Sequence, residues 1–276
     1  MTYDVRSASV RFGDTLALDD VSLHVEPGSV LAVVGGDGAG KTTLLRALAG
    51  EVQLERGQVN APSAEAIGYM PATAGSWSSL TVEQNMDFVG GIYGLSGNAL
   101  ASRRDELLKR ASLGHVADRL ASQLSGGMRR KLGFAMAMLH DPALLVLDEP
   151  STGIDPVSRV DLWRLVSEAA AAGAAVVMST TYLDEAERAA SLLVLDGGRT
   201  LVSGTLTDVL GSFGGAMAAT ATPRRREWAW RRGRVYHEYW PTVSDVPLET
   251  TALIPDLEDV VVTLSMLKAH DKELAS

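Results

Sequence analysis

"SVLAVVGGDGAGKTTLLRALAG", residues 29–50, is the segment that decides the fold of this sequence. It begins with a short apolar run rich in valine that ends in glycines, which predicts a buried strand entering a tight turn. Leu44, Leu45 and Leu48 then share one helical face, and Gly50 is the expected C-cap. A strand, a glycine-rich turn and a helix are therefore expected in direct succession.

The turn itself, "GGDGAGKT" at residues 35–42, fits the phosphate-loop pattern of Gly, four residues, Gly, Lys and Ser or Thr. Its glycines let successive backbone N–H groups point at one cluster of phosphate oxygens, and the helix start adds a positive dipole end. Lys41 supplies a charge for the β- and γ-phosphates, and the Thr42 hydroxyl can ligate Mg²⁺. The expected nucleotide-binding residues are Gly35, Gly36, Asp37, Gly38, Ala39, Gly40, Lys41, Thr42 and Thr43.

Two more apolar runs, "ALLVLD" at 143–148 and "AAVVMST" at 174–180, predict further buried strands. The segment between them starts with Asp155 as a helix N-cap and Pro156 in the first turn. Buried strands that alternate with helices indicate an α/β domain with a largely parallel sheet. Residues 3–25 alternate more and suggest an antiparallel flank, whereas residues 81–140 are helical by pattern.

The segment "LLVLDEP", residues 144–150, places Asp148 at the tip of a buried apolar strand. A carboxylate in that position is costly unless it meets a cation, and Mg²⁺ on a nucleotide is the natural partner. Glu149 comes next and can polarise an attacking water, which makes it the candidate catalytic residue. A strand-end pair of acids without this role is the alternative, and a nearby phosphate loop disfavours it.

The segment "LSGGM", residues 124–128, predicts a second anion site. The Ser125 hydroxyl and the amides of Gly126 and Gly127 open a helix whose apolar positions follow. One chain thus carries two phosphate-binding helix ends, and a single nucleotide in one chain does not need both. Two chains packed head to tail would use them, with each Ser125 loop closing over the partner's phosphate loop.

These motifs, together with "TGIDP" at 152–156, resemble the ATP-binding subunit of an ABC transporter in order and spacing. The resemblance covers residues 3–212. It implies an α/β P-loop NTPase of the ABC type, with an antiparallel β flank, a helical subdomain inserted at about 76–140 and a small C-terminal α+β extension at 213–276. The segment 124–159 and the tail "IPDLEDVVVTL" at 254–264 are similar to ABC-2-type, drug-efflux-like exporter subunits.

The resemblance implies further roles. ATP and Mg²⁺ would be the cofactors, with Thr42 and Asp148 on the metal. Phe12 would stack on adenine, although it could equally be a core residue, and Asp155 would lie in a loop at the dimer contact. The partners would be a transmembrane permease subunit and a second ATP-binding subunit. The chain would then be cytoplasmic and peripheral on the inner face of the cell membrane, and it would power export.

The sequence departs from the family pattern at two positions. The glutamine expected after "GYMP" would be residue 72, and this chain has Ala72. The switch histidine expected after "AAVVMST" would be residue 181, and this chain has Thr181. Loss of one preorganised donor typically lowers a rate by about 10²–10³, and two losses need not add because such groups act as a unit.

We therefore expect ATP to bind at this chain's own phosphate loop but to hydrolyse slowly there. Because "LSGGM" is intact, the chain can complete a site on a partner, which favours a heterodimer with a different ATPase subunit, although a homodimer is possible. One alternative is a regulatory module that stabilises a complex by binding ATP with little hydrolysis. Another is a non-transport ABC ATPase of DNA repair or translation, which usually has two fused halves or long coiled-coil inserts.

Composition excludes several classes of protein and of partner. The 276 residues are 46% hydrophobic and contain no cysteine, so the chain is globular and has neither disulfides nor thiolate metal sites. The first residues show no apolar signal-peptide core, and no apolar run approaches the roughly 18 residues of a membrane helix. The net charge of −9 argues against nucleic acid as a partner.

Residues 222–241, "TPRRREWAWRRGRVYHEYWP", differ from this acidic average with six arginines and two glutamates. The alternation around "RRGR" predicts a β-hairpin. Its arginine stems could simply cover an aromatic face. A contact with anionic lipid or with the membrane subunit is the second interpretation, because basic, Trp-rich surfaces suit a membrane interface; nucleic-acid binding is the least favoured.

Overall fold

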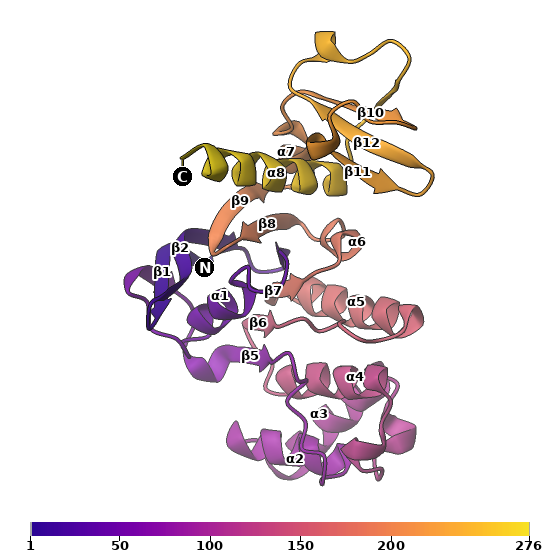
Figure 1. Ribbon diagram of the computed structural model, residues 1–276. Coiled ribbons are helices and arrows are strands. Elements are labelled where there is room, and N and C mark those ends of the chain that lie inside the picture. The colour runs from indigo at the N-terminus through magenta and orange to yellow at the C-terminus, as the bar shows by residue number, and fades with distance from the viewer. Residues whose placement is uncertain (1, 276) are drawn as a thin grey trace. The chain divides into compact units, whose positions relative to one another are not determined.

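The computed structural model describes residues 2–275 (Figure 1). The chain divides into two compact units, the first ending at Thr200 and the second beginning at Leu201. The sequence analysis instead expected a C-terminal extension that begins at residue 213, and that boundary stays a prediction.

A six-stranded sheet with the order β5-β6-β7-β3-β8-β9 forms the centre of the fold. Its strands are β3 (Val30–Val34), β5 (Ile67–Met70), β6 (Leu144–Leu147), β7 (Ala175–Thr180), β8 (Ser191–Asp196) and β9 (Arg199–Gly204). The neighbours from β5 to β8 pair in parallel. Every residue of β3, β6 and β7 is buried, as expected for parallel strands covered on both faces. The predicted parallel α/β core is confirmed.

The two faces of this sheet belong to two separate hydrophobic cores, because successive side chains of a strand point in opposite directions. In β7, Ala175 and Val177 pack in a core with α1 (Lys41–Leu48) and the antiparallel flank. Val176 and Met178 pack in the other core with the helices α4 (Gly126–Ala137) and α5 (Pro156–Ala171). The sheet therefore lies between two layers and presents the ends of its strands to the site.

The antiparallel flank has the strand order β2-β1-β4. It consists of β1 (Tyr3–Phe12), β2 (Thr15–Val25) and β4 (Arg56–Asn60). The flank predicted for residues 3–25 is thus confirmed and has a third strand. All five residues of β4 are exposed, so no apolar alternation signalled it in the sequence.

The helical subdomain follows β5 and precedes β6. It contains α2 (Val82–Ile92), α3 (Gly97–Arg110) and α4, with short 3₁₀ helices at Gly114–Val116 and Ala121–Gln123; another 3₁₀ turn, Ala64–Ala66, precedes β5. Asn85 is fully buried and donates hydrogen bonds to the carbonyls of Trp77, Leu80 and Thr81. This one amide holds the segment that leads into α2, so an irregular connection is kept in a fixed shape.

The C-terminal unit has a four-stranded antiparallel sheet with the order β11-β12-β10-β13. Its elements are α7 (Leu206–Gly211), β10 (Ala216–Thr220), β11 (Ala229–Arg232), β12 (Val235–Trp240), β13 (Thr251–Leu253) and α8 (Leu257–Ala275), with 3₁₀ turns at Arg226–Trp228 and Val243–Asp245. Met217, Trp228 and Tyr239 form its small core. The predicted hairpin within 222–241 and the α+β character of the extension are confirmed.

Several arginines of this hairpin interact with acidic or aromatic residues of the same unit. Arg224 is paired with Glu249, and Arg232 lies 2.7 Å from an Asp256 carboxylate oxygen. The Arg225 guanidinium lies over the rings of Trp228 and Trp240, at 5.4 and 5.5 Å. A contact of this stretch with anionic lipid stays a prediction. Across residues 2–275 no helix combines the length and the apolar character that crossing a membrane requires.

Candidate functional site

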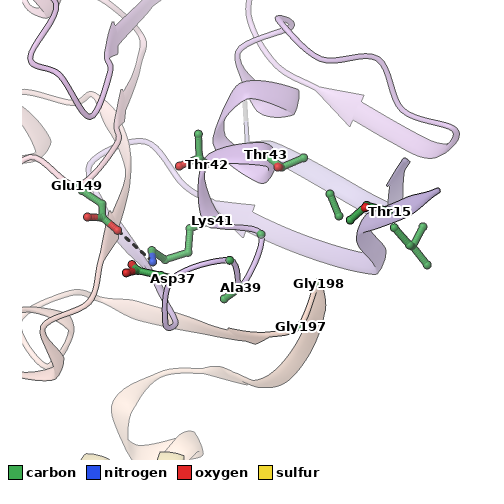
Figure 2. A pocket seen from close by; sticks show the side chains of 13 residues that line it. Thr15, Asp37, Ala39, Lys41, Thr42, Thr43, Glu149, Gly197 and Gly198 are labelled. Carbon is green, nitrogen blue, oxygen red and sulfur yellow. Dashed lines mark ion pairs between the residues drawn. The ribbon is translucent and has the colours of Figure 1, made fainter. Parts of the chain in front are cut away.

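A pocket of about 450 Å³ lies over the phosphate loop and is shown from close by in Figure 2. Two backbone segments that the sequence did not point to complete its wall, one from the start of β2 and one from the turn between β8 and β9. The lining residues are Thr15, Leu16, Ala17, Asp37, Gly38, Ala39, Gly40, Lys41, Thr42, Thr43, Glu149, Gly197 and Gly198. The predicted phosphate loop therefore faces a cavity.

Two glycines of the loop are required by close approaches of the backbone. Gly40 is the N-cap of α1 with φ +102°, and a Cβ there would lie 2.8 Å from the carbonyl oxygen of Ala17. A Cβ at Gly35 would lie 2.5 Å from the carbonyl oxygen of Leu195. Since side chains do not fit at these points, the loop can turn tightly enough to aim its N–H groups at one ligand.

Lys41 is buried at the floor of the pocket, with its side chain 5% exposed. Its ammonium group donates to the carbonyls of Gly35 (2.8 Å) and Gly36 (3.1 Å) and lies 3.0 Å from a Glu149 carboxylate oxygen. Figure 2 shows the Lys41 and Glu149 side chains pointing toward each other. The cation is thus fixed where the loop, the pocket and the candidate catalytic acid meet.

Asp148 and Glu149 follow β6, and their geometry depends on the neighbouring strand β7. The Ser179 hydroxyl donates to an Asp148 carboxylate oxygen at 2.7 Å and accepts from the backbone N–H of Glu149 at 2.8 Å. Glu149 has φ +46°, a left-handed conformation that is uncommon for a residue other than glycine. Ser179 therefore holds both carboxylate residues, one by its side chain and the other by its backbone.

The carboxylate of Glu149 has a fixed partner on each oxygen. Lys41 lies beside Oε1, and the Thr152 hydroxyl donates to Oε2 at 2.9 Å. Because the side chain is 19% exposed and lines the pocket, it can reach a small molecule there. Once the Lys41 ammonium turns to a phosphate, the freed carboxylate oxygen can accept a hydrogen bond from a water and orient it.

Magnesium would find suitable donors at this site. Thr42 lines the pocket with its hydroxyl group (Figure 2), whereas the Asp148 carboxylate is only 1% exposed and is not among the lining residues. Burial raises the pKa of nearby Tyr69 to about 12, and the negative charge of Asp148 adds to this effect. Mg²⁺ uses oxygen ligands and needs only one or two from the protein when phosphates and water supply the rest.

A second polar network lies beneath the loop that follows Glu149. Glu185 is fully buried, and one of its carboxylate oxygens accepts from the hydroxyls of Ser151 and Thr180, both at 2.7 Å. Ser179 thus bonds directly to Asp148 and Glu149, whereas Thr180 bonds to Glu185, which accepts from Ser151 of the loop. Sequence reasoning missed Ser179, Thr180 and Glu185, because their roles depend on strand neighbours and not on any motif.

The two positions that depart from the family pattern lie outside the pocket wall. Ala72 follows β5, Thr181 follows β7, and both residues are exposed. The backbone carbonyl of Ala72 accepts a hydrogen bond from Arg130 of α4. The Ala72 side chain carries no polar group, and Thr181 does not line the pocket that Lys41 and Glu149 share.

The predicted second anion site, the signature loop of residues 124–128, lies at the start of α4. Ser125 is the N-cap, and its hydroxyl accepts from the backbone N–H of Met128. Ser125 and Gly126 are exposed and do not line the chain's own pocket, whereas Gly127 is buried against α5. A Cβ at Gly127 would lie 2.3 Å from the Ser158 hydroxyl, so the contact requires glycine.

Asp155 caps α5 beside this loop. Its carboxylate accepts from the backbone N–H groups of Val157 (3.1 Å) and Ser158 (3.0 Å), and the bonds from Ser158 lower the pKa of Asp155. The predicted N-cap is confirmed. Phe12, the candidate for adenine stacking, lies at the end of β1 outside the pocket wall and is 52% exposed. It is therefore not a core residue, and its stacking role stays a prediction.

A phosphate loop between a strand of a parallel sheet and a helix, with an acidic pair at the end of another strand, defines the class of P-loop nucleotide-binding proteins. Comparison with known proteins narrows this class. The sequence model of the ABC transporter family matches residues 18–152. A daunorubicin resistance ATP-binding protein, DrrA3 of Streptomyces coeruleorubidus, is 35% identical over 222 residues, which are 76% of this chain and 70% of that protein. This chain belongs to the ABC transporter ATP-binding family.

Two further similarities agree with this assignment. The probable multidrug ABC transporter ATP-binding protein YbhF of Escherichia coli is 38% identical over 201 residues, which are 69% of this chain. The matched part is 35% of that relative, so the chain spans about a third of its length. A solved ATP-binding subunit of an ABC transporter has 29% identity and a TM-score of 0.71, with 77% of this chain and 93% of that chain covered. The predicted ABC-type P-loop fold is confirmed.

Proposed function

We propose that this chain is the ATP-binding subunit of an ABC exporter and powers transport by a separate membrane subunit. The observation that carries this proposal is the position of Lys41, which lies between the loop carbonyls and Glu149 at the floor of the pocket. Binding of ATP would close a pair of such chains, and hydrolysis would reopen it. The names of the multidrug and daunorubicin-resistance relatives support export as the direction.

Different residues of the site would bind the phosphates, the Mg²⁺ ion and the attacking water. The N–H groups of residues 35–43 and the start of α1 bind phosphate oxygens, and Lys41 moves its charge from Glu149 to the β- and γ-phosphates. Thr42 and Asp148 would hold Mg²⁺, which neutralises phosphate charge when bound. Release from Lys41 frees one oxygen of Glu149 to orient a water, while Thr152 keeps the other in place.

Hydrolysis at this chain's own site is proposed to be slow. Glu149 is well held, but Ala72 and Thr181 supply no long polar side chain beside the γ-phosphate position. Removal of one preorganised donor typically lowers the rate by about 10²–10³. Because binding depends mainly on backbone N–H groups and Lys41, affinity for ATP should be retained.

The second ATP-binding subunit is proposed to be a different chain. Ser125 and Gly126 are exposed at the start of α4, so this loop is free to cover a partner's nucleotide. Single-turnover ATP hydrolysis should be slow for this chain alone and fast when a candidate partner with an intact site is added. A Ser125→Arg variant, which blocks the loop, should remove the acceleration. Fast turnover by this chain alone would contradict the proposal, and it would leave a homodimer as the simpler arrangement.

The membrane subunit is proposed to contact the segment between Ala72 and α2. Trp77 and Phe88 form an edge-to-face pair with ring centroids 4.6 Å apart, and they are 42% and 48% exposed. Ile92, one turn further along α2, is 65% exposed. An exposed apolar patch of this kind suits a protein partner, and such a contact would keep the chain on the inner face of the membrane.

A regulatory module that acts by ATP binding alone is the second candidate, and the short side chains of Ala72 and Thr181 favour it. A Glu149→Gln variant separates the two candidates in a reconstituted transport assay. Reduced transport would mean that hydrolysis at this site is used. Unchanged transport would mean that the site acts by binding alone.

A further inference from the structure

Arg130 connects two loops of the site that are not joined to each other in sequence. It lies in the second turn of α4, next to the turn that begins at Ala72 and the loop that carries Glu149. Its guanidinium donates through Nη1 to the carbonyl of Ala72 and through Nη2 to the carbonyl of Thr152, the latter at 3.2 Å. The two loops follow β5 and β6, which are parallel neighbours, so both emerge at the same edge of the sheet.

The turn after Ala72 also rests directly on α4. Ala74 and Gly75 both have φ +67°, so the chain reverses sharply there. A Cβ at Gly133, one turn beyond Arg130, would lie only 2.5 Å from the carbonyl oxygen of Ala74. Arg130 therefore reaches a turn that the same helix already supports through a close backbone contact.

The other end of this connection reaches the candidate catalytic acid. Thr152 donates to Glu149 twice, through its hydroxyl to Oε2 at 2.9 Å and through its backbone N–H to the carbonyl at 3.3 Å. Burial lowers the pKa of Arg130, and the negative charges of Glu149 and Asp148 act against this. An arginine stays protonated under such conditions, so it remains a donor to both carbonyls.

We propose that Arg130 is a positioning residue that ties the turn at residues 72–77 to the loop of Glu149 and Thr152. A movement of Glu149 on nucleotide binding then passes through Thr152 and Arg130 to that turn. Arg130 of α4 thus links the turn to the Glu149 loop, a link that the alanine side chain at residue 72 cannot make. The tie itself follows from the contacts alone, whereas its response to nucleotide rests on the proposed function.

Amide hydrogen exchange of the full chain tests the tie first without nucleotide. An Arg130→Met variant, which keeps the apolar stem but loses both bonds, should exchange about tenfold faster at residues 72–77 than the wild type. Arg130→Lys, which reaches one carbonyl at a time, should give an intermediate rate and covers the case in which the methionine variant does not fold. Arg129→Met is the matched control, because the Arg129 guanidinium donates to the nearby carbonyl of Ser122 and, among the described residues, hydrogen bonds to neither loop.

The second arm adds a non-hydrolysable ATP analogue with Mg²⁺. In the wild type, exchange should slow both at residues 35–43 and at residues 72–77. In Arg130→Met it should slow at 35–43 only. Unchanged exchange at 72–77 in the nucleotide-free variants, or an equal effect of Arg129→Met, would overturn the tie. Equal slowing at 72–77 in Arg130→Met and wild type would overturn the proposal that Arg130 passes the movement of Glu149 to this turn. No slowing at 35–43 in any variant would instead refute the proposed function, and the nucleotide-free arm would still decide the tie.

Discussion

The phosphate-loop side of the pocket and its strand-end side differ in how completely they are built. The loop side has every element that nucleotide binding needs: tight glycine turns, a helix N-terminus and a buried lysine with fixed partners. On the strand-end side, formed by the residues that follow β5, β6 and β7, hydrogen bonds to Ser179 hold Asp148 and Glu149 in place. Ala72 and Thr181 on the same side supply no long polar side chain. We propose from this difference that ATP binding and ATP hydrolysis depend on different parts of one site.

Binding and hydrolysis could be separated because they use different kinds of atoms. Phosphate binding uses backbone N–H groups and one ammonium group, so it persists when side chains elsewhere change. Stabilisation of a transition state needs side-chain donors at defined positions, so it is lost when a side chain becomes too short. The variants below test this separation in order of decreasing effect.

The largest effect is expected at Lys41. Lys41→Met should weaken ATP binding by about 10- to 150-fold, since hydrogen bonds to charged groups contribute roughly 1.5–3 kcal/mol each. The control is Arg46→Met on the same helix, because this exposed arginine forms an ion pair with Glu51 and does not line the pocket. Equilibrium titration with a fluorescent ATP analogue measures both variants. Equal affinities for the two would show that the loop side does not depend on its lysine.

Removal of the Ser179 hydroxyl should affect the strand-end side alone. Ser179→Ala leaves the Glu149 N–H and an Asp148 oxygen without their partner, so the free energy of unfolding should fall by about 1–3 kcal/mol. Hydrolysis should slow further while ATP affinity stays within about twofold of the wild type. Urea unfolding and single-turnover assays provide the two measurements.

Thr180→Val is the companion variant, because Thr180 bonds to Glu185 and not to Glu149. It should lower stability without lowering the single-turnover rate to the same extent. If both variants slow hydrolysis equally, the frame around Glu149 depends on general packing and not on Ser179.

The smallest effect is expected at Asp155, away from the pocket. Asp155→Ala should lower Tm by about 2–4 °C through loss of the α5 cap, whereas Asp155→Asn keeps a capping acceptor. The pKa of Asp155 is lowered in the folded chain from 3.8. Its carboxylate therefore stabilises the fold above that pH, and the contribution disappears as the pH falls through the lowered pKa. The stability difference between wild type and Asp155→Asn should shrink as the pH falls below 3.8; a constant difference between pH 6 and about pH 2.5 would contradict this.

Sequence patterns predicted the parts of the fold that have a strong period or a fixed motif. The buried strands β3, β6 and β7 were continuous apolar runs, and the phosphate loop, the N-caps Ser125 and Asp155 and the hairpin β11–β12 followed from residue type and spacing. The strand β4 was missed, because a fully exposed edge strand has no apolar pattern. The C-cap of α1 is Ala49, one residue before the expected Gly50.

The site was harder to predict where it depends on neighbours in space. Ser179 reaches Asp148 because β6 and β7 pair with Leu147 opposite Met178, and no local pattern reports that register. Gly197 and Gly198 line the pocket only through their backbone, so no side-chain chemistry identified them. Arg130 belongs to no predicted site, and its role depends on the two carbonyls that the fold places beside it.

The central claim is that this chain binds ATP well and hydrolyses it slowly because of residues 72 and 181. The most direct measurement is the single-turnover hydrolysis rate of the Ala72→Gln/Thr181→His double variant, compared with the wild type at saturating ATP, under one set of conditions for assembly. The account predicts a rate higher by about 10–100-fold with ATP affinity changed by less than about threefold. A double variant that hydrolyses no faster than the wild type, while binding ATP equally well, would contradict it.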